Sequence, residues 1–255
     1  MNPFSQDQFR IEVSLDMPGA YHMQRDLELV TQLQADPESQ NVLRLYSWSP
    51  SCISLGMGQD ESVLHLGACK NNGVDFVKRP TGGRAVYHAK ELTYAVIMRF
   101  EPSDGIYAVH NKIATWLLEL LQPLCNNELE LLSCNGKSSI REAYSPGSLT
   151  NLACFASTAR YEISWHGKKV IGSAQRRFGS AILQHGSILL NEEHLRLPEF
   201  LNLSSTEREA MRVMLMAETA TISEIRGAQI TPSEVIELML HRHELQTPLP
   251  GINQI

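Results

Sequence analysis

The sequence has few cysteines, no long apolar run and no excess of positive charge. Its five cysteines (Cys52, Cys69, Cys125, Cys134 and Cys154) are odd in number and form no Cys-x-x-Cys pair. This usage favours reduced thiols over a disulfide framework and argues against a structural zinc site. No stretch of about 18 apolar residues occurs, which excludes a membrane-spanning helix of ordinary length.

The formal net charge is −6, which gives no general reason to expect nucleic-acid binding. The first eight residues are polar and lack the basic and apolar regions of a secretory signal. We therefore expect a cytoplasmic protein that binds neither nucleic acid nor membrane. The 255 residues, 43% hydrophobic and 20% charged, suit one large domain or one domain with a small appendage.

The apolar spacing predicts a chain of strands with interspersed helices, followed by helices alone. Met23, Leu27, Val30 and Leu33 recur at helical spacing and predict a helix over 21–35. Apolar positions also predict a helix over 109–121, strands over 42–48, 74–78, 92–100 and 182–190, and a hairpin over 161–171 that turns at 166–167. Residues 125–150 show little periodicity and are expected to form a long surface excursion.

The tail changes character after residue 203. Residues 204–217 have a helical pattern, and Thr231-Pro232-Ser233-Glu234 is typical of a helix start with a capping box. Connections of the hairpin type favour an α+β fold with a largely antiparallel or mixed sheet. We predict a catalytic domain over 1–203 and a helical extension over 204–255 packed on it.

The first candidate site is the loop from Arg79 to His88. Its adjacent glycines, Gly82 and Gly83, free backbone N–H groups to approach a ligand, and Arg79 and Arg84 could supply positive charge. The alternative is a tight turn whose arginines face solvent. The spacing is that of neither a phosphate-binding loop nor a dinucleotide fingerprint.

The second candidate is Lys169, at the start of a hairpin strand. The small residues Gly172, Ser173 and Ala174 follow it, as suits a strand beside a pocket, and Gln175 could orient a ligand. The competing interpretation is an exposed strand lysine. A lysine fixed on a strand could instead present its charge to an acyl carbonyl or phosphate oxygen.

The third candidate is Cys154, which follows the irregular excursion. Buried cysteines usually act as small apolar residues, but a cation such as Lys169 could raise the thiolate fraction of this one. Cys154 could then hold an acyl group as a thioester. His88 and His185 could be satisfied within the sheet or line a site, and no grouping of residues has metal-ligand spacing.

Two ordered motifs resemble those of the biotin/lipoate protein ligase superfamily. The segment from Arg79 to His88, followed by Glu91-Leu92-Thr93-Tyr94, resembles its RRxTGGxAVxH…ELTY element. Residues 167–175 (GKKVIGSAQ) with 184–189 (QHGSIL) resemble its GKKxxGSAQ…xxHGSIL element, and residues 21–26 align loosely with its N-terminal helix motif. The resemblance covers roughly residues 10–200.

The resemblance implies a biotin-protein-ligase-like (class II synthetase-like) catalytic domain, with a central mixed sheet flanked by helices and a helical tail. Its ATP-dependent members activate lipoate as an acyl-adenylate. Its cysteine-dependent octanoyltransferases and amidotransferases hold the acyl group as a thioester, and there a Cys-Phe pair precedes the GKK hairpin. Cys154-Phe155 stands at that place in this chain.

The resemblance therefore predicts transfer of an octanoyl or lipoyl group to a lysine of a lipoyl domain. The donor would be acyl carrier protein or glycine cleavage H protein, and no cofactor or metal would be needed. The implied catalytic residues are Cys154 and Lys169, and the implied substrate-binding residues are Arg79, Gly82, Gly83, Arg84, His88, Gly172, Ser173, Ala174, Gln175, His185 and Gly186. The alternatives are an ATP- and Mg²⁺-dependent lipoate ligase, and a non-catalytic carrier-binding or lipoate-sensing protein.

Overall fold

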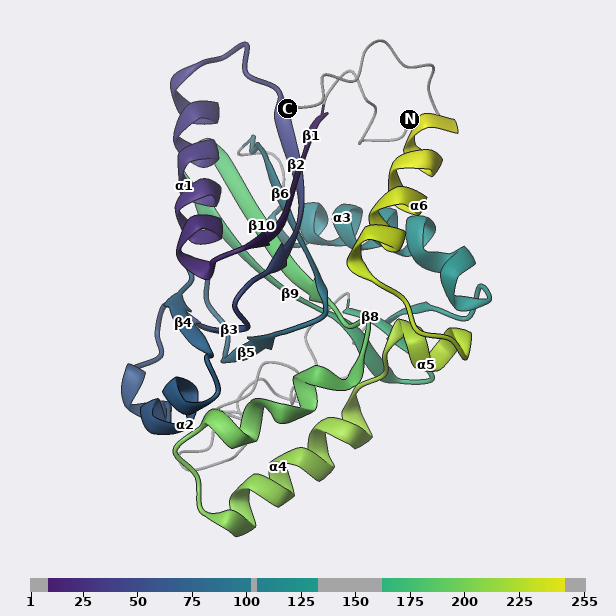
Figure 1. Ribbon diagram of the computed structural model, residues 1–255. Helices are drawn as coiled ribbons and strands as arrows, with labels where there is room; N and C mark the ends of the chain where they lie inside the picture. The colour runs from purple at the N-terminus through teal and green to yellow at the C-terminus, as the bar shows by residue number, and fades with distance from the viewer. Residues whose placement is uncertain (1–8, 102–104, 133–161, 246–255) are drawn as a thin grey trace.

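The computed structural model describes residues 9–101, 105–132 and 162–245 (Figure 1). The first half contains β1 (Phe9–Met17), α1 (Gly19–Ala35), β2 (Asn41–Trp48), β3 (Cys52–Leu55), η1 (Glu61–Val63), α2 (Leu66–Asn71), β4 (Asp75–Lys78), β5 (Val86–His88), β6 (Leu92–Arg99) and α3 (Ile106–Leu121). The second half contains η2 (Gln122–Cys125), β7 (Glu130–Leu132), β8 (Glu162–Trp165), β9 (Lys168–Phe178), β10 (Ala181–Ile188), η6 (Glu192–Phe200), α4 (Ser205–Glu218), α5 (Ile222–Arg226) and α6 (Pro232–Leu245).

A seven-stranded sheet in the order β1-β2-β6-β10-β9-β8-β7 forms the centre of the molecule. The pair β1 and β2 is parallel, and the remaining neighbours are antiparallel, so the sheet is mixed. A second sheet of three strands has the order β4-β3-β5. The predicted α+β class with a central mixed sheet and flanking helices is confirmed; the small second sheet was not predicted.

Helices cover both faces of the large sheet, as alternation along the strands requires. On one face α1 packs on Val42, Tyr46, Ala95 and other residues of β2, β6 and β10. On the other face α3, α5 and α6 contribute to the cluster that holds Leu43, Leu45, Leu92, Tyr94 and Val96. Figure 1 shows α1 and α3 as the two layers that enclose the sheet.

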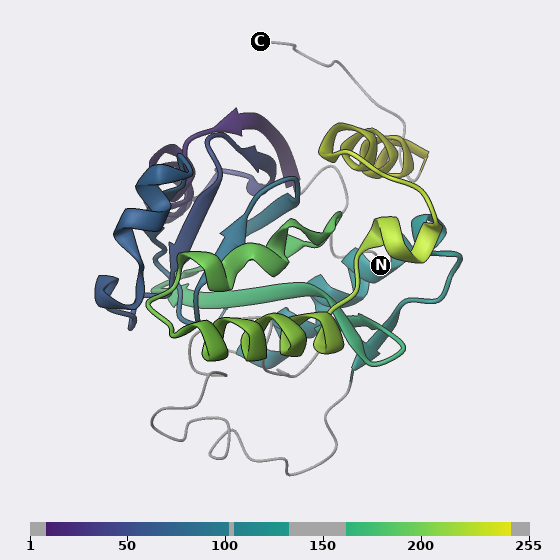
Figure 2. The ribbon, with the colours of Figure 1, turned by 60° about the horizontal axis from the view of Figure 1, so that its bottom comes forward.

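The small sheet has its own apolar cluster. Ile53 and Leu55 of β3 pack with Phe200 of η6 and with Met211 and Leu215 of α4. Figure 1 shows η6 and α4 running side by side at the bottom of the molecule, in agreement with their close packing, and Figure 2 shows the same two helices after rotation. This arrangement places the loop between β4 and β5 between the two sheets.

Most predicted elements are confirmed to within a few residues at their ends. The helix starting near residue 231 has the predicted capping box: Glu234 accepts from the Thr231 backbone N–H at 2.7 Å, and Thr231 accepts from the Glu234 N–H at 3.3 Å. The hairpin β8–β9 turns at His166 and Gly167, both with positive φ. Elements too short for periodicity, such as β3, β5 and α5, escaped prediction, as did β1.

Two predictions were wrong. Leu27 is exposed, and the polar residues Asp26 and His22 lie on the buried face of α1 instead. Asp26 pairs with buried Arg44 and His185 of the sheet, so the face of α1 that carries Asp26 packs against the sheet. The predicted excursion over 125–150 contains the strand β7, which pairs with β8 over only three residues and is too short to detect; residues 133–150 lie outside the described part of the chain.

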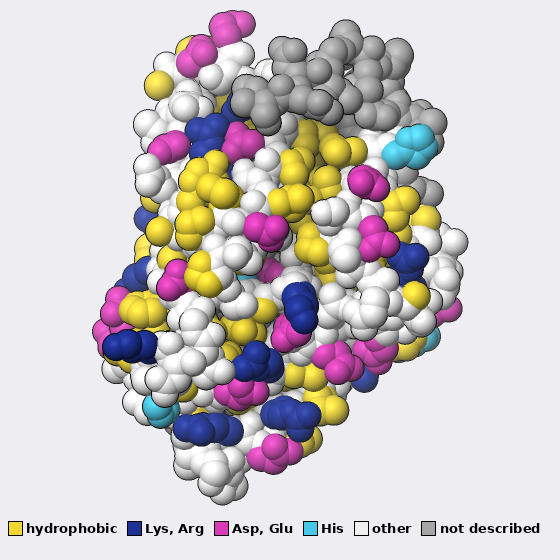
Figure 3. Space-filling view, in the orientation of Figure 1, with side chains coloured by type: hydrophobic (Ala, Val, Ile, Leu, Met, Phe, Trp, Pro, Cys, Tyr) yellow, Lys and Arg dark blue, Asp and Glu magenta, His cyan; other side chains and the backbone are white. Residues whose placement is uncertain are grey.

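β1 forms one edge of the large sheet and carries exposed Val13 and Leu15. Figure 3, in the orientation of Figure 1, shows hydrophobic side chains gathered over the middle of the visible face of the molecule, with acidic and basic side chains lower down. Among the described residues, the structure contains no helix long and apolar enough to cross a membrane.

Candidate active site

A narrow, mostly apolar hollow lies where the two sheets meet, with about 350 Å³ of empty space, part of it open to solvent. It is lined by residues from α1, both sheets and the β4–β5 loop: Met23, Tyr46, Trp48, Ser54, Arg79, Val86, His88, Thr93, Gly172, Ser173, Ala174, His185, Gly186 and Ser187. Seven of the predicted substrate-binding residues meet here.

One side of the hollow rests on a buried ionic network under α1. Asp26 pairs with Arg44, and both are fully buried. The other oxygen of Asp26 lies 3.1 Å from His185 Nδ1, and His185 Nε2 lies 2.7 Å from Thr81 Oγ1. Burial lowers the pKa of His185. The network thus connects α1 through His185 to the glycine loop.

A second network fixes His88. Its Nε2 lies 2.7 Å from Ser54 Oγ and its Nδ1 lies 2.6 Å from Glu91 Oε1. Trp48 stacks on the imidazole with ring centroids 4.0 Å apart, and its Nε1 donates to Thr93 Oγ1 at 2.7 Å. His88 therefore lines the hollow in a single, well-defined orientation.

A third set of hydrogen bonds joins β6, β9 and β10. Tyr94 and Ser173 hydroxyls lie 2.7 Å apart, Gln184 donates to the Tyr94 hydroxyl at 2.9 Å, and Gln175 donates to Gln184 at 2.9 Å. Burial raises the pKa of Tyr94 to about 12, so the phenol is protonated at neutral pH. Gln175 thus supports the strands and does not line the hollow itself.

Close backbone packing requires a glycine at residue 186. A Cβ at Gly186 would lie 2.5 Å from the Gly172 carbonyl oxygen and 2.8 Å from Tyr94 Cε1. Such distances are too short for any real side chain, so a larger residue would force the strands apart. By contrast, a Cβ at Gly82 would meet no atom within 4 Å.

Arg79 holds the glycine loop from inside. It is 5% exposed, and its guanidinium donates to the carbonyl oxygens of Ser54 (2.8 Å), Gly82 (3.0 Å) and Arg84 (2.6 Å). The interpretation of Arg79 as a solvent-facing turn residue is therefore wrong. Gly83, whose φ is +94°, lies against Gly56. A Cβ added at Gly56 would lie 2.0 Å from the Gly83 carbonyl oxygen.

Lys169 is buried rather than exposed, which overturns the competing interpretation of a solvated strand lysine. It is 4% exposed, and its Nζ lies 2.7 Å from Glu162 Oε1. Glu162 begins β8, directly after the segment 133–161. Lys169, Gly82, Gly83, Arg84 and Gln175 are not among the described residues that line the hollow.

Cys154 lies outside the described residues. The described cysteines Cys52, Cys69 and Cys125 are free and buried. Burial raises the pKa of all three, and that of Cys125 to about 12, so none is a reactive thiolate. The expectation that most cysteines act as small apolar residues is confirmed for these three. Among the described residues, no three His, Cys, Asp or Glu side chains gather as a metal site would require.

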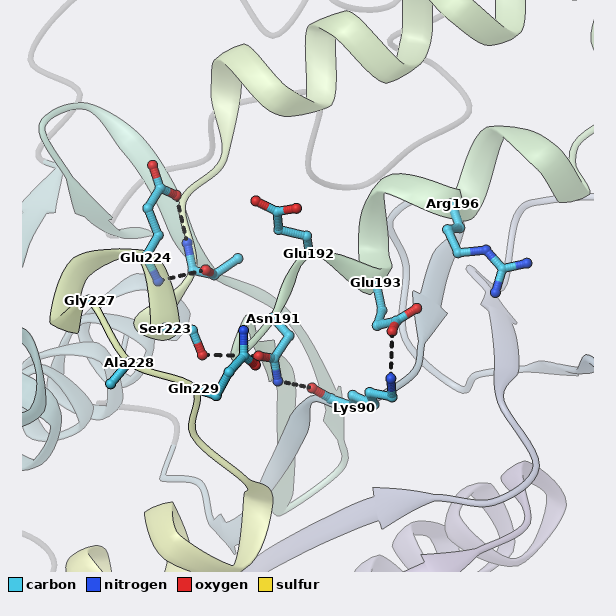
Figure 4. A pocket seen from close by; sticks show the side chains of 11 residues that line it. Lys90, Asn191, Glu192, Glu193, Arg196, Ser223, Glu224, Gly227, Ala228 and Gln229 are labelled. Carbon is cyan, nitrogen blue, oxygen red and sulfur yellow. Dashed lines mark hydrogen bonds and ion pairs between the residues drawn. The ribbon is translucent and has the colours of Figure 1, made fainter.

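A wider hollow on the surface contains none of the predicted site residues (Figure 4). Its polar groups bond mostly to one another: Lys90 pairs with Glu193 at 2.9 Å, and Ser223 donates to Asn191 at 3.0 Å. Figure 4 shows these pairs spread along its wall. The mostly apolar hollow between the sheets is therefore the better candidate for an acyl chain.

Sequence reasoning missed several residues of the site. Tyr46 and Trp48 were assigned to a strand without a role, and Ser54 lies on a strand too short to detect. Asp26 fell within the loosely matching helix motif, and its acidic side chain among apolar helical positions was the one available signal. Glu162 was noted only as a hairpin residue.

The fold and site define a catalytic domain of the lipoate ligase type. The profile of the lipoyl protein ligase A/B catalytic domain matches residues 18–244, and the chain belongs to this family. Two similar curated proteins are the octanoyltransferases LipM of Brevibacillus brevis (36% identical over 236 residues, 91% of this chain and 84% of that protein) and of Symbiobacterium thermophilum (33% over 225 residues, 85% and 78%).

Solved structures agree on the fold. Ta0514, a putative lipoate protein ligase from T. acidophilum with bound lipoic acid, superposes with a TM-score of 0.66 at 20% identity, over 94% of this chain and 85% of that chain. A lipoate-protein ligase A bound with ATP gives the same score, identity and coverage. The recognised superfamily is confirmed.

Proposed function

We propose that this protein is an octanoyltransferase of lipoate cofactor biosynthesis, which moves an octanoyl group from a carrier protein to a lysine of a lipoyl domain. The observation that carries this proposal is the similarity to LipM octanoyltransferases at 31–36% identity over most of the chain. The apolar side chains of Met23, Val86 and Trp48 in the hollow have the chemical character that contact with an acyl chain requires. The same similarity favours a catalyst over a non-catalytic carrier-binding protein.

In the proposed mechanism the Cys154 thiolate attacks the donor thioester. A new thioester forms on Cys154 and the donor thiol leaves. The ammonium of Lys169 stabilises the negative charge that develops on the acyl oxygen, a contribution of about 3 kcal/mol for one donor. The neutral amine of the acceptor lysine then attacks the enzyme thioester, and an amide forms as Cys154 is released.

The residues around the hollow would position the acyl group. Gly172, Ser173, Ala174 and Gly186 present small side chains or bare backbone to it. Gly82, Gly83 and Arg84 would close the carbonyl end, held in place by Arg79. His88 and His185 would line the walls, each fixed by a buried carboxylate.

In this proposal the reaction requires neither ATP nor a metal ion. The donor is octanoyl-acyl carrier protein or octanoyl-H protein, and the acceptor is a lipoyl domain. The alternative is a lipoate ligase that uses ATP and Mg²⁺, with Cys154 as a bystander. The reduced, buried thiols of Cys52, Cys69 and Cys125 support a cytoplasmic setting.

We propose further that residues 204–255 are a helical extension of a catalytic domain over 1–203. Supporting contacts come from the backbone: the Ala220 N–H donates to the Lys169 carbonyl at 3.0 Å, and Thr219 pairs with Lys169 in a parallel bridge. Val235 and Met239 of α6 join the main apolar cluster. The extension would thereby hold the strand that carries Lys169.

The test is incubation with octanoyl-acyl carrier protein, without ATP or Mg²⁺, followed by intact mass measurement. We expect one octanoyl group on the protein, and its transfer when a lipoyl domain is added. Cys154→Ser should lose both the adduct and transfer to an acceptor lysine. Cys69→Ser, a matched change at a buried cysteine of α2, should retain both. Wild-type transfer by Cys154→Ser, or transfer only with ATP and Mg²⁺, would contradict the thioester mechanism.

A further inference from the structure

The second buried network has the connectivity of a serine–histidine–carboxylate triad. Ser54 Oγ lies 2.7 Å from His88 Nε2, and His88 Nδ1 lies 2.6 Å from Glu91 Oε1. Both distances are those of a nucleophile hydrogen-bonded to a base and of that base oriented by a third group. Ser54 and His88 also line the hollow between the two sheets.

The surrounding hydrogen bonds fix the direction of this chain. Glu91 Oε1 accepts hydrogen bonds from Thr93 Oγ1 at 2.6 Å and from Ser187 Oγ at 3.1 Å. An oxygen that accepts from both hydroxyls has no proton to donate, so in its contact with His88 the imidazole Nδ1–H is the donor. In the neutral imidazole Nε2 is then an acceptor, and the Ser54 hydroxyl donates to it. Proton transfer from Ser54 to His88 is the direction that activates a serine.

Two further features suit a nucleophile. The guanidinium NH1 of Arg79 donates to Ser54 Oγ at 3.1 Å, which places positive charge beside the oxygen as it loses its proton. Trp48 stacks on His88 with an interplanar angle of 13° and prevents the ring from turning away. The strand register explains the placement, because Cys52 pairs with His88 and Ser54 with Val86, so Ser54 and His88 share one face.

We propose that Ser54, His88 and Glu91 form a second catalytic centre, which hydrolyses medium-chain acyl esters and thioesters bound in the hollow. This chemistry does not use Cys154 and goes beyond the proposed transfer reaction. It acts on the same class of acyl group, and it releases a free fatty acid rather than an amide.

The reaction has two balanced steps. Ser54 Oγ attacks the acyl carbon, its proton moves to His88 Nε2, and the bond to the donor sulfur or oxygen breaks as that atom takes the proton. Water then attacks the acyl–serine ester and gives a proton to His88. Ser54 Oγ leaves with that proton, and the carboxylic acid is released.

The test uses the full chain carrying Cys154→Ala, so that the cysteine cannot react, and an octyl fluorophosphonate as the probe. Ser54 Oγ should displace fluoride and retain one phosphonyl group, measured by intact mass and located by peptide mapping. Glu91→Gln should slow labelling by about 10-fold or more, because the base loses its oriented carboxylate. Ser54→Ala should show no adduct.

Ser47→Ala is the matched control. Ser47 is a buried serine of β2 whose hydroxyl bonds to Asp16 and has no histidine partner, so its loss should leave labelling unchanged. Hydrolysis of 4-nitrophenyl octanoate, measured in the Cys154→Ala background, should be lost in Ser54→Ala, slowed in Glu91→Gln and unchanged in Ser47→Ala. An adduct on any residue other than Ser54, or a folded Cys154→Ala protein that acquires none, would overturn the proposal.

Peptide mapping identifies the labelled residue even where Ser54→Ala does not fold. The result is also independent of the transferase assignment. Loss of amide formation in Cys154→Ser tests the transferase, and serine labelling in Cys154→Ala tests the triad. Either proposal can therefore fail while the other stands.

Discussion

Lys169 Nζ lies 2.7 Å from Glu162 Oε1, and the side chains of both residues are 5% exposed. The pair joins β8 to β9, two neighbours in the large sheet. The carboxylate fixes the position of the ammonium, and the hydrogen bond from the Ala220 N–H to the Lys169 carbonyl, beside the bridge with Thr219, fixes the Lys169 backbone. A charge held in this way needs little reorganisation when an acyl oxygen becomes negative.

Lys169→Met should reduce acyl transfer by about 100-fold or more, because one preorganised cationic donor is lost. It should also lower the free energy of unfolding by about 3 kcal/mol, because Glu162 would remain buried without its cation. Transfer rates and urea denaturation measure the two effects.

The adjacent Lys168→Met is the control and should change neither, since Lys168 is only partly buried. The double variant Lys169→Met/Glu162→Gln should recover part of the lost stability but not the activity. A Lys169→Met protein with wild-type transfer would contradict the role of this residue.

Two glycine substitutions should separate packing from ligand approach. Gly186→Ala should lower stability by about 1–3 kcal/mol and reduce transfer, because its Cβ would press on the Gly172 oxygen and the Tyr94 ring. Gly82→Ala meets no protein atom within 4 Å and should leave the melting temperature unchanged.

If the loop approaches the acyl carbonyl as proposed, Gly82→Ala will nevertheless reduce transfer. Melting curves and transfer rates for both variants provide the measurement. Full activity in Gly82→Ala would remove Gly82 from the substrate-binding residues.

Asp26→Ala should be among the most destabilising single changes in α1. It leaves Arg44 fully buried without this carboxylate and removes the support of His185, so we expect a loss of about 3 kcal/mol. Glu28→Ala, an exposed partner of Arg25 on the same helix, should leave the denaturation midpoint nearly unchanged. Equal midpoints for the two variants would mean that the buried network contributes little to stability.

Stability should fall as the pH is lowered from about 6.5 toward 4. Burial lowers the pKa values of His22 and His194 to about 4, against an ordinary value near 6.5 in the unfolded chain. The unfolded state therefore binds more protons in this window, and stability rises with pH, by at most about 1.4 kcal/mol per pH unit for each histidine.

Urea denaturation at several pH values measures this slope. His22→Gln should reduce it, whatever its effect on stability at pH 7. The exposed His166→Gln, at the tip of the β8–β9 turn, should leave it as in the wild type. A wild-type midpoint that is constant across the window would show that these histidines are not buried as neutral groups.

The sequence by itself determined the class of the fold, most of the longer elements and the family. Apolar periodicity over ten or more residues marks a helix such as α3, and Pro and Gly mark the glycine loop, because these signals depend only on neighbours along the chain. The motifs around Arg79 and Lys169 were also sufficient to place the chain in the biotin/lipoate protein ligase superfamily.

Only the tertiary structure decided which side chains meet. Arg79 could face a ligand or solvent, and the pairing of β3 with β4 excluded solvent by bringing the Ser54 carbonyl beside its guanidinium. Lys169 could be solvated or buried, and the register of β8 against β9 decided by placing Glu162 within 2.7 Å. Such contacts join residues distant in sequence, so no local pattern encodes them. The Ser54–His88–Glu91 alignment arises in the same way, from strand register rather than from any motif.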